Sequence, residues 1–164
     1  MPIIAAGWGR EEETGELSDI LSYIEIKEFA DQEKCANYWF QGAILEGMIC
    51  TQAVEKNGEY AHTTSGDSGG PLFVELRDGF FVQLALVSWG TTETFNGNNT
   101  MDVNTDVVYY KNWILRTMEY WNNDTLIRFP FTMEWTDKYP GNVGILLASD
   151  PDGVSHTVCK EGIV

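Results

Sequence analysis

Short apolar runs separated by Gly, Asn or Asp recur along most of this chain, and they limit its fold more than any other feature. The runs cover residues 3–8, 21–26, 47–50, 71–76, 80–89 and 101–103. Runs of this length between turn residues are typical of antiparallel strands. Between two of them, Arg77-Asp78-Gly79 predicts a hairpin turn in which the glycine takes a positive φ. The sequence therefore predicts an all-β domain.

Two segments are expected to be helical instead. Residues 28–39 form a short mixed stretch, and a second segment repeats apolar residues at intervals of three and four, which predicts a helix with one apolar face. Asn122 and Asn123 are expected to end that second helix. Residues 122–164 then change in composition, with prolines and turn signals, and read as an extension with one or two strands. The residues of the predicted apolar face are Tyr110, Trp113, Ile114, Thr117, Met118 and Trp121.

The hexapeptide Gly-Asp-Ser-Gly-Gly-Pro at residues 66–71 nominates Ser68 as a nucleophile. A serine attacks a carbonyl only if a base takes its proton and donors wait for the oxyanion. Glycines permit a tight turn and can aim the amides of Gly66 and Ser68 at one point. Asp67 is a charge in a bend that we expect to be buried, so it needs a partner. The alternative is a plain glycine-rich turn, which favours the same residue types.

The charge balance excludes some partners. Ten Lys and Arg residues against 25 Asp and Glu give a net charge of −15, which argues against nucleic acid and anionic membranes. Acidic residues gather at positions 11–19, which we interpret as a solvated loop, with a cation site as the alternative. No apolar run approaches the length that spans a membrane, so we expect a soluble globular chain. No metal or cofactor is expected.

Cysteines and glycosylation patterns favour export. Cys35 and Cys50 lie near each other among only three cysteines, so a disulfide between them is expected in an oxidising compartment, and Cys159 is left over. N-glycosylation patterns start at Asn98 and Asn123. The amino terminus carries no signal-peptide pattern, and we expect the chain to begin inside a strand.

Taken in order, the motifs resemble the C-terminal half of a chymotrypsin-like (trypsin-like, S1) serine protease, over roughly residues 3–121. The resemblance implies the second antiparallel β-barrel of that fold, with a short intermediate helix and a C-terminal helix. We therefore expect a barrel at 1–121 and an unmatched extension of unknown role at 122–164. The matching motifs are Gly7-Trp8-Gly9, Cys35 followed by Tyr38-Trp39, Met48-Ile49-Cys50, the hexapeptide, Val87-Ser88-Trp89-Gly90 and Trp113-Ile114.

The resemblance also implies roles for individual residues. Ser68 is the expected nucleophile, and the amides of Gly66 and Ser68 are the expected oxyanion hole. Asp67 matches the carboxylate that pairs with the new amino terminus released on activation. Ser88, Trp89 and Gly90 match the edge that pairs with the backbone of a peptide substrate. Cys35 and Cys50 match a family disulfide, and the family is secreted and needs no cofactor.

The primary specificity pocket is expected to be unusual. The resemblance assigns His62, Thr63 and Asp102 to it, with His62 at the floor and Asp102 where the family has a small glycine. We expect the imidazole and the carboxylate to pair, which would narrow the pocket and leave an indistinct preference. The alternative is a shift in this alignment, because the loop at 51–61 is longer than usual.

Departures from the family limit the expected activity. The family carries its catalytic His and Asp in an N-terminal barrel before the Gly7-Trp8-Gly9 strand, and this chain starts at that strand, so we expect both to be absent. His62 falls on the wrong side of the serine to act as base, and His156 lies in the extension, where a surface or packing role is expected. Thr64 and Thr94 stand where the family has a cysteine pair, which favours an adapted fold.

Two functions follow from these observations. The first is the nucleophile-bearing half of a secreted serine endopeptidase, inactive by itself and completed by the missing N-terminal barrel. The second is a non-catalytic pseudoprotease that uses the barrel as a secreted binding or regulatory module. A half barrel of unrelated activity is disfavoured, because an apolar face would be left exposed. The sequence upstream of Met1 would separate the first two.

Overall fold

A computed structural model describes residues 1–11, 15–40, 42–56, 59–77, 79–90, 100–123, 133–136 and 144–147 of the chain. Several sequence predictions concern residues outside these ranges. A further prediction concerns the side chain of Asn123, which also lies outside the described part of the chain. The residues concerned are Glu12, Glu13, Asp78, Thr94, Asn98, His156 and Cys159.

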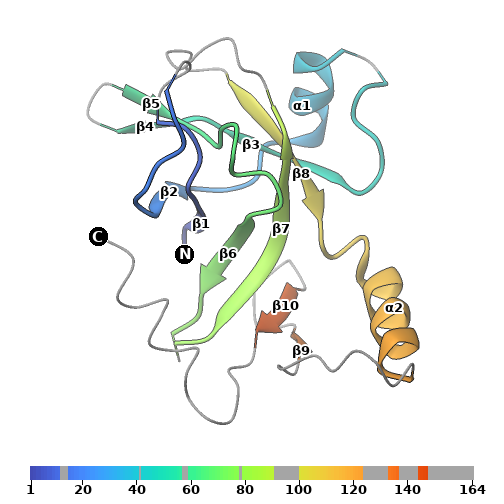
Figure 1. The fold of residues 1–164 in the computed structure, drawn as a ribbon. Helices are drawn as coiled ribbons and strands as arrows, with labels where there is room; N and C mark the ends of the chain where they lie inside the picture. Colours follow the sequence, from blue (N-terminus) through green and yellow to red (C-terminus); the bar gives the residue numbers. More distant parts are fainter. Residues whose placement is uncertain are drawn as a thin grey trace.

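The described residues form a curved, half-barrel antiparallel sheet in which hydrogen-bonded neighbours follow the order β2-β1-β6-β7-β8-β3 (Figure 1). The predicted all-β class is confirmed, and each predicted run coincides with a strand, although β8 continues to Asp106. A separate hairpin of β4 and β5 was not predicted. The bounds are β1 Ile3–Gly7, β2 Ser22–Ile26, β3 Met48–Gln52, β4 Val54–Lys56, β5 Glu59–Ala61, β6 Pro71–Glu75, β7 Phe81–Trp89 and β8 Met101–Asp106.

The hairpin of β6 and β7 runs through the middle of the sheet. Gly79 takes a φ of 81° at its turn, as predicted. The register between the two strands shifts where Leu72 pairs with Ala85 but Phe73 pairs with Gln83, so Leu84 is an extra residue on β7. This β-bulge explains why Leu84 and its neighbour Ala85 are both buried, although alternate residues of a regular strand face opposite sides.

A second register shift lies at the other end of β7, where it pairs with β8. Val87 pairs with Asn104 and Trp89 pairs with Val103, which leaves Ser88 as the extra residue. Ser88 is exposed, whereas Val87 is buried. The bulge therefore lies within the segment for which a peptide-binding role is expected.

A large hydrophobic cluster fills the concave side of β1, β2, β6 and β7. Burial of such side chains is the main favourable contribution to folding. Its buried members are Ile3, Ala5, Ile26, Leu72, Val74, Leu76, Val82, Leu84, Ala85 and Val87.

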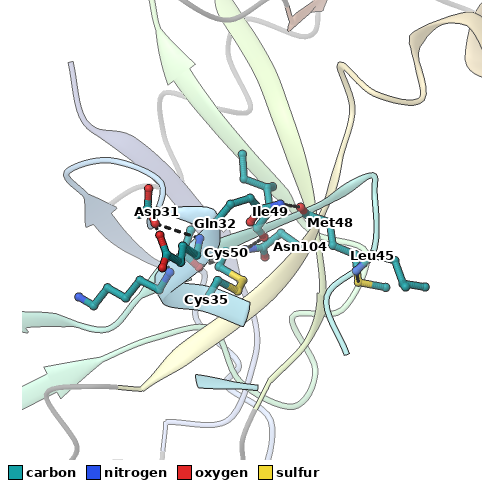
Figure 2. Close-up of a disulfide and its surroundings, with 11 residues drawn as sticks. Asp31, Gln32, Cys35, Leu45, Met48, Ile49, Cys50 and Asn104 are labelled. Carbon is teal, nitrogen blue, oxygen red and sulfur yellow. Dashed lines mark hydrogen bonds between the residues drawn. A yellow bond between two sulfur atoms is a disulfide. The ribbon is translucent and has the colours of Figure 1, made fainter. Parts of the chain in front are cut away.

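A smaller cluster forms around the predicted disulfide between Cys35 and Cys50, which is confirmed (Figure 2). The disulfide joins helix α1 (Gln32–Tyr38) to β3, with Cα atoms 6.2 Å apart. Helix α1 begins later than predicted because Asp31 caps it, accepting hydrogen bonds from the amides of Glu33 and Lys34. Met101 and Val103 of β8 complete the buried cluster.

Helix α2 (Lys111–Asn123) forms close to where its periodicity predicts and follows β8 (Figure 1). Its expected apolar face is only partly covered: Ile114 and Met118 are half-buried, and Trp113 is 65% exposed. In the described part of the chain, no helix is long and apolar enough to cross a membrane.

The stretch predicted to hold one or two strands contains β9 (Met133–Thr136) and β10 (Gly144–Leu147). Strand β10 pairs with Phe81–Gln83, at the start of β7, whereas β8 pairs with the later part of β7. The boundary near residue 121 remains a prediction, since these strands share a sheet with the barrel.

Candidate active site

Ser68 lies in a tight turn, and two backbone hydrogen bonds connect the residues after Ser68 to β7. The amide of Gly69 donates to the carbonyl of Val87, and the amide of Val87 donates to the carbonyl of Gly70, at 2.8 and 2.9 Å. Gly66 and Gly69 have φ values of 106° and 81°, in the left-handed region that favours glycine. These glycines therefore allow a turn that leaves Ser68 exposed to solvent.

The amides of this turn fall into two groups. Those of Asp67, Gly69 and Gly70 donate hydrogen bonds to carbonyls of the chain. In the part of the chain that the structure describes, the amides of Gly66 and Ser68 donate none. Two available amides on either side of Asp67 are what an oxyanion hole requires. That role stays a prediction.

The carboxylate of Asp67 is held by backbone amides. It accepts hydrogen bonds from the amide of Gly9 at 2.7 Å and from the amide of Thr64 at 2.9 Å. A methyl group added at Gly7 or Gly9 would overlap this carboxylate. The Gly7-Trp8-Gly9 motif thus makes room for Asp67, a packing role that the sequence analysis did not foresee.

A cavity of about 380 Å³ adjoins Asp67. Strands β1 and β2 form one side of it, and residues 60–64 form another. The titratable residues on its wall are Arg10, Glu11, Tyr23, Tyr60, His62 and Asp67. A cavity with a half-buried carboxylate at its edge can receive a small cationic group.

The predicted pairing of His62 with Asp102 is confirmed. His62 Nδ1 lies 3.3 Å from Asp102 Oδ1, and both side chains are 4% exposed. Asp102 Oδ2 also accepts hydrogen bonds from Thr63, from its amide at 3.0 Å and from its hydroxyl at 2.8 Å. A methyl group on Gly90 would overlap Asp102 Oδ1, so this cluster packs directly against the end of the Ser88-Trp89-Gly90 segment.

The protonation of His62 follows from this cluster. Burial acts to lower the pKa of the imidazole, but the hydrogen bond and the negative charge of Asp102 outweigh burial, and Asp67 adds to them. The pKa of His62 is therefore raised above its ordinary value of 6.5. At neutral pH, the protonated form of His62 is therefore favoured more than that of a free histidine.

The structure brings His62, Thr63, Gly90 and Asp102 together, as the specificity-pocket assignment requires. In the described residues, no hydrogen bond joins His62 to Ser68, in keeping with the expectation that His62 is not its base. Trp89 packs edge-on against Trp39, with ring centroids 4.7 Å apart, which sequence reasoning did not foresee. Asn123 is the last residue of α2.

Comparisons with known proteins agree with this geometry. The family model for trypsin matches residues 1–114. "Trypsin eta" of Drosophila melanogaster is 36% identical over 111 residues, which cover 68% of this chain and 38% of that protein. "Transmembrane protease serine 11C" of Mus musculus is 31% identical over 113 residues, which cover 68% of this chain and 25% of that protein. The chain thus spans well under half the length of these relatives.

Proposed function

Because this chain belongs to the trypsin family of serine proteases, we propose that it contributes the nucleophile and oxyanion hole of a serine endopeptidase. The reaction is peptide-bond hydrolysis through an acyl-enzyme. The observation that carries this proposal is the Ser68 turn, in which Ser68 is exposed and its own amide and that of Gly66 donate no hydrogen bond within the described residues.

The chemistry of this site starts with attack of Ser68 Oγ on the carbonyl carbon of the substrate. The amides of Gly66 and Ser68 donate hydrogen bonds to the oxygen as it becomes negative. A base takes the serine proton and later returns a proton to the leaving amine. Water then attacks the acyl-enzyme and restores Ser68.

The base and its orienting carboxylate belong to the N-terminal barrel that the family places before the Gly7-Trp8-Gly9 strand. His62 does not fill this role, since no hydrogen bond joins it to Ser68 within the described residues. The 164 residues by themselves are therefore inactive or nearly so. In the reference case, enzymes that lose triad members keep a residual of roughly 10³ to 10⁴ over water from the oxyanion hole and substrate binding.

The cavity beside Asp67 receives a new amino terminus when the protease is activated. A carboxylate offers about four lone-pair sites, and the amides of Gly9 and Thr64 fill two of those on Asp67. An α-ammonium group in the cavity adds a charge-assisted hydrogen bond and neutralises the charge of the half-buried Asp67. This step fixes the turn that carries Ser68.

The substrate and the compartment follow from the same family membership. An extended peptide pairs with Ser88, Trp89 and Gly90, where the bulge leaves Ser88 outside the register with β8. The Cys35–Cys50 disulfide is typical of oxidising compartments, which supports a secreted or cell-surface protein.

A non-catalytic binding module is the second candidate. It is favoured by one observation, the carboxylate of Asp102 that packs against Gly90 where a substrate side chain is expected to enter. In that case the barrel recognises partners and Ser68 performs no chemistry.

Fluorophosphonate labelling separates the two functions. We expect the probe to label the whole protein that carries this sequence, and the Ser68→Ala variant to show no labelling. The isolated 164-residue chain should label at least about a hundredfold more slowly, because the base contributes at least that much. A folded whole protein that is not labelled would contradict catalysis and support the binding module.

A further inference from the structure

Thr64 connects the Ser68 turn to the segment that follows β1. Its amide donates to the Asp67 carboxylate at 2.9 Å, and its carbonyl accepts from the Asp67 amide at 3.0 Å. Its hydroxyl donates to the carbonyl of Arg10 at 2.8 Å. Asp67 Oδ2 lies farther from this hydroxyl, at 3.4 Å, so the single hydroxyl proton is directed to the Arg10 carbonyl. One residue thus contacts both sides of the junction between the turn and the segment.

Two backbone hydrogen bonds cross the same junction. The amide of Gly9 donates to Asp67 Oδ1 at 2.7 Å, and the amide of Arg10 donates to the carbonyl of Ser65 at 3.1 Å. Any residue type except proline supplies such an amide. The hydroxyl of Thr64 adds a third hydrogen bond, and this one depends on the side chain.

The junction lies directly beside Gly66, whose amide is one of the two expected oxyanion donors. A methyl group added at Gly66 would come within 3.2 Å of the Cα atom of Gly9 and would overlap the side chain of Leu17. Leu17 in turn forms a β-bridge with Arg10. The segment therefore packs closely against the turn, so a shift of Arg10 changes the support of Gly66.

The oxyanion hole depends on the direction of the Gly66 and Ser68 amides. In reference enzymes, removing one oxyanion donor costs about 10² to 10³ in rate, and a displacement of about 1 Å can cost about 10². The hydrogen bond from Thr64 lies near the surface, where a single hydrogen bond contributes little to the stability of a fold. Its loss is therefore expected to change the rate more than the stability.

We propose that Thr64 is a positioning residue for the oxyanion hole. Its hydroxyl holds the segment after β1 against the turn, so that the amides of Gly66 and Ser68 keep their direction. This inference rests on the proposed function for its reaction. The hydrogen bond from Thr64 does not depend on the chemistry of Ser68, so its effect on the turn can be measured even in a protein that performs no catalysis.

The test compares Thr64→Val, which removes the hydroxyl at nearly constant volume, with Thr64→Ser, which keeps it. The whole protein that carries this sequence is labelled with a fluorophosphonate, in which Ser68 displaces fluoride from phosphorus and the phosphonyl oxygen takes the place of the oxyanion. We expect Thr64→Val to lower the maximal rate constant of labelling about tenfold and to leave the half-saturating probe concentration within about twofold. Thr64→Ser should label within about twofold of the natural rate constant.

Thr105→Val is the matched control. Thr105 is a half-buried threonine of β8, and the same substitution there should change the rate constant less than about twofold. All variants are compared at a temperature where circular dichroism shows them fully folded, so that unfolding does not contribute to the rates. A rate constant that is unchanged in Thr64→Val, or lowered equally in Thr64→Ser, would overturn the proposal. If Thr64→Val does not fold, Thr64→Ala takes its place with the same expected results.

The amides around the turn give a readout that needs no catalysis. In heteronuclear NMR spectra, the amide resonances of Gly66 and Ser68 should move in Thr64→Val and not in Thr64→Ser. Hydrogen exchange at the amides of Gly9 and Arg10 should accelerate at least about threefold in Thr64→Val alone. If the natural protein is not labelled, the proposed function fails, and these amides still decide the role of Thr64. Resonances and exchange that stay unchanged in Thr64→Val would overturn that role.

Discussion

At the scale of single residues, the two carboxylates of the site are held by different kinds of donor. Asp67 accepts hydrogen bonds from the backbone amides of Gly9, 58 residues away in the sequence, and of Thr64, three residues away. Asp102 accepts hydrogen bonds from the amide of Thr63 and from side chains, and one of these side chains, His62, can lose its charge. The surroundings of Asp102 therefore change with pH as His62 titrates.

Asp67 can be tested by removing only its charge. In Asp67→Asn, one amide hydrogen bond must be lost or reversed, because the new side chain has a single oxygen. We expect the free energy of unfolding to fall by about 1 to 3 kcal/mol, measured by urea denaturation. The exposed Glu25→Gln serves as the matched control and should change stability by less than about 0.5 kcal/mol. Equal effects of the two substitutions would contradict the role given to Asp67.

His62 gives the stability a defined pH dependence. Its pKa is higher in the folded chain than its ordinary value of 6.5, so the folded state binds more protons in this range. The contribution is fully present below pH 6.5 and is lost as the pH rises through the folded pKa. Urea unfolding of the protein with His62 should therefore show stability falling above pH 6.5 relative to His62→Gln. A difference between the two proteins that does not vary with pH would be incompatible with this account.

At the scale of elements, the strands could be predicted because short apolar runs report burial directly. The hairpin of β4 and β5 could not be predicted, because Val54–Lys56 and Glu59–Ala61 mix apolar and polar residues. These two short strands pair with each other, and no apolar run marks either of them. The start of α1 was placed too early, because the side chain of Asp31, rather than the pattern of hydrophobic residues, sets where the helix begins. The bulges in β7 also left no mark in the residue pattern.

The candidate site likewise contains residues that could be predicted from the sequence and contacts that could not. Ser68 stands out in the sequence because its glycine neighbours are unusual, and the His62–Asp102 pair could be inferred once the family resemblance was used. The partners of Asp67 could not be inferred, because they are backbone amides and any residue type supplies one. The packing of Trp39 against Trp89 depends on how α1 lies against the end of β7, which no local pattern encodes.

The disulfide is the main covalent support of the smaller cluster. Replacing both Cys35 and Cys50 by alanine should lower the free energy of unfolding by about 3 kcal/mol, because the unfolded chain gains the freedom of the closed loop. The measurement is urea denaturation, with and without a reducing agent. The unreduced double variant and the reduced natural protein should agree within about 1 kcal/mol. A natural protein whose stability does not respond to reduction would rule out this contribution.

At the scale of the whole molecule, helix α2 and the turn before it present aromatic side chains to solvent. Tyr109, Trp113 and Tyr120 are each more than half exposed, at 53%, 65% and 69%. Exposed apolar groups in one region are typical of an interface. This exposure fits the proposal that the barrel described here is completed by a further barrel in the whole protein.

The extension can be tested by shortening the chain. If the barrel is a unit that ends near residue 121, a chain of residues 1–123 should fold and unfold cooperatively. Loss of β10 removes one of the two strands that flank Phe81–Gln83, so the exchange of amides that face β10 should accelerate at least about tenfold, while amides that face β6 stay protected. Exchange at Ala85–Val87, which pair with β8, is the internal control and should change far less. Failure of this shorter chain to fold would contradict the boundary.

Strand β7 has one further property that follows from its bulge at Ser88. Alternate residues of a regular strand point the same way, so Val87 and Trp89 would lie on one side of the sheet. The additional residue reverses this alternation, so Val87 and Trp89 point to opposite sides. Val87 contributes to the large cluster, whereas Trp89 packs with the cluster around the disulfide. One inserted position thus lets a single strand anchor two hydrophobic cores.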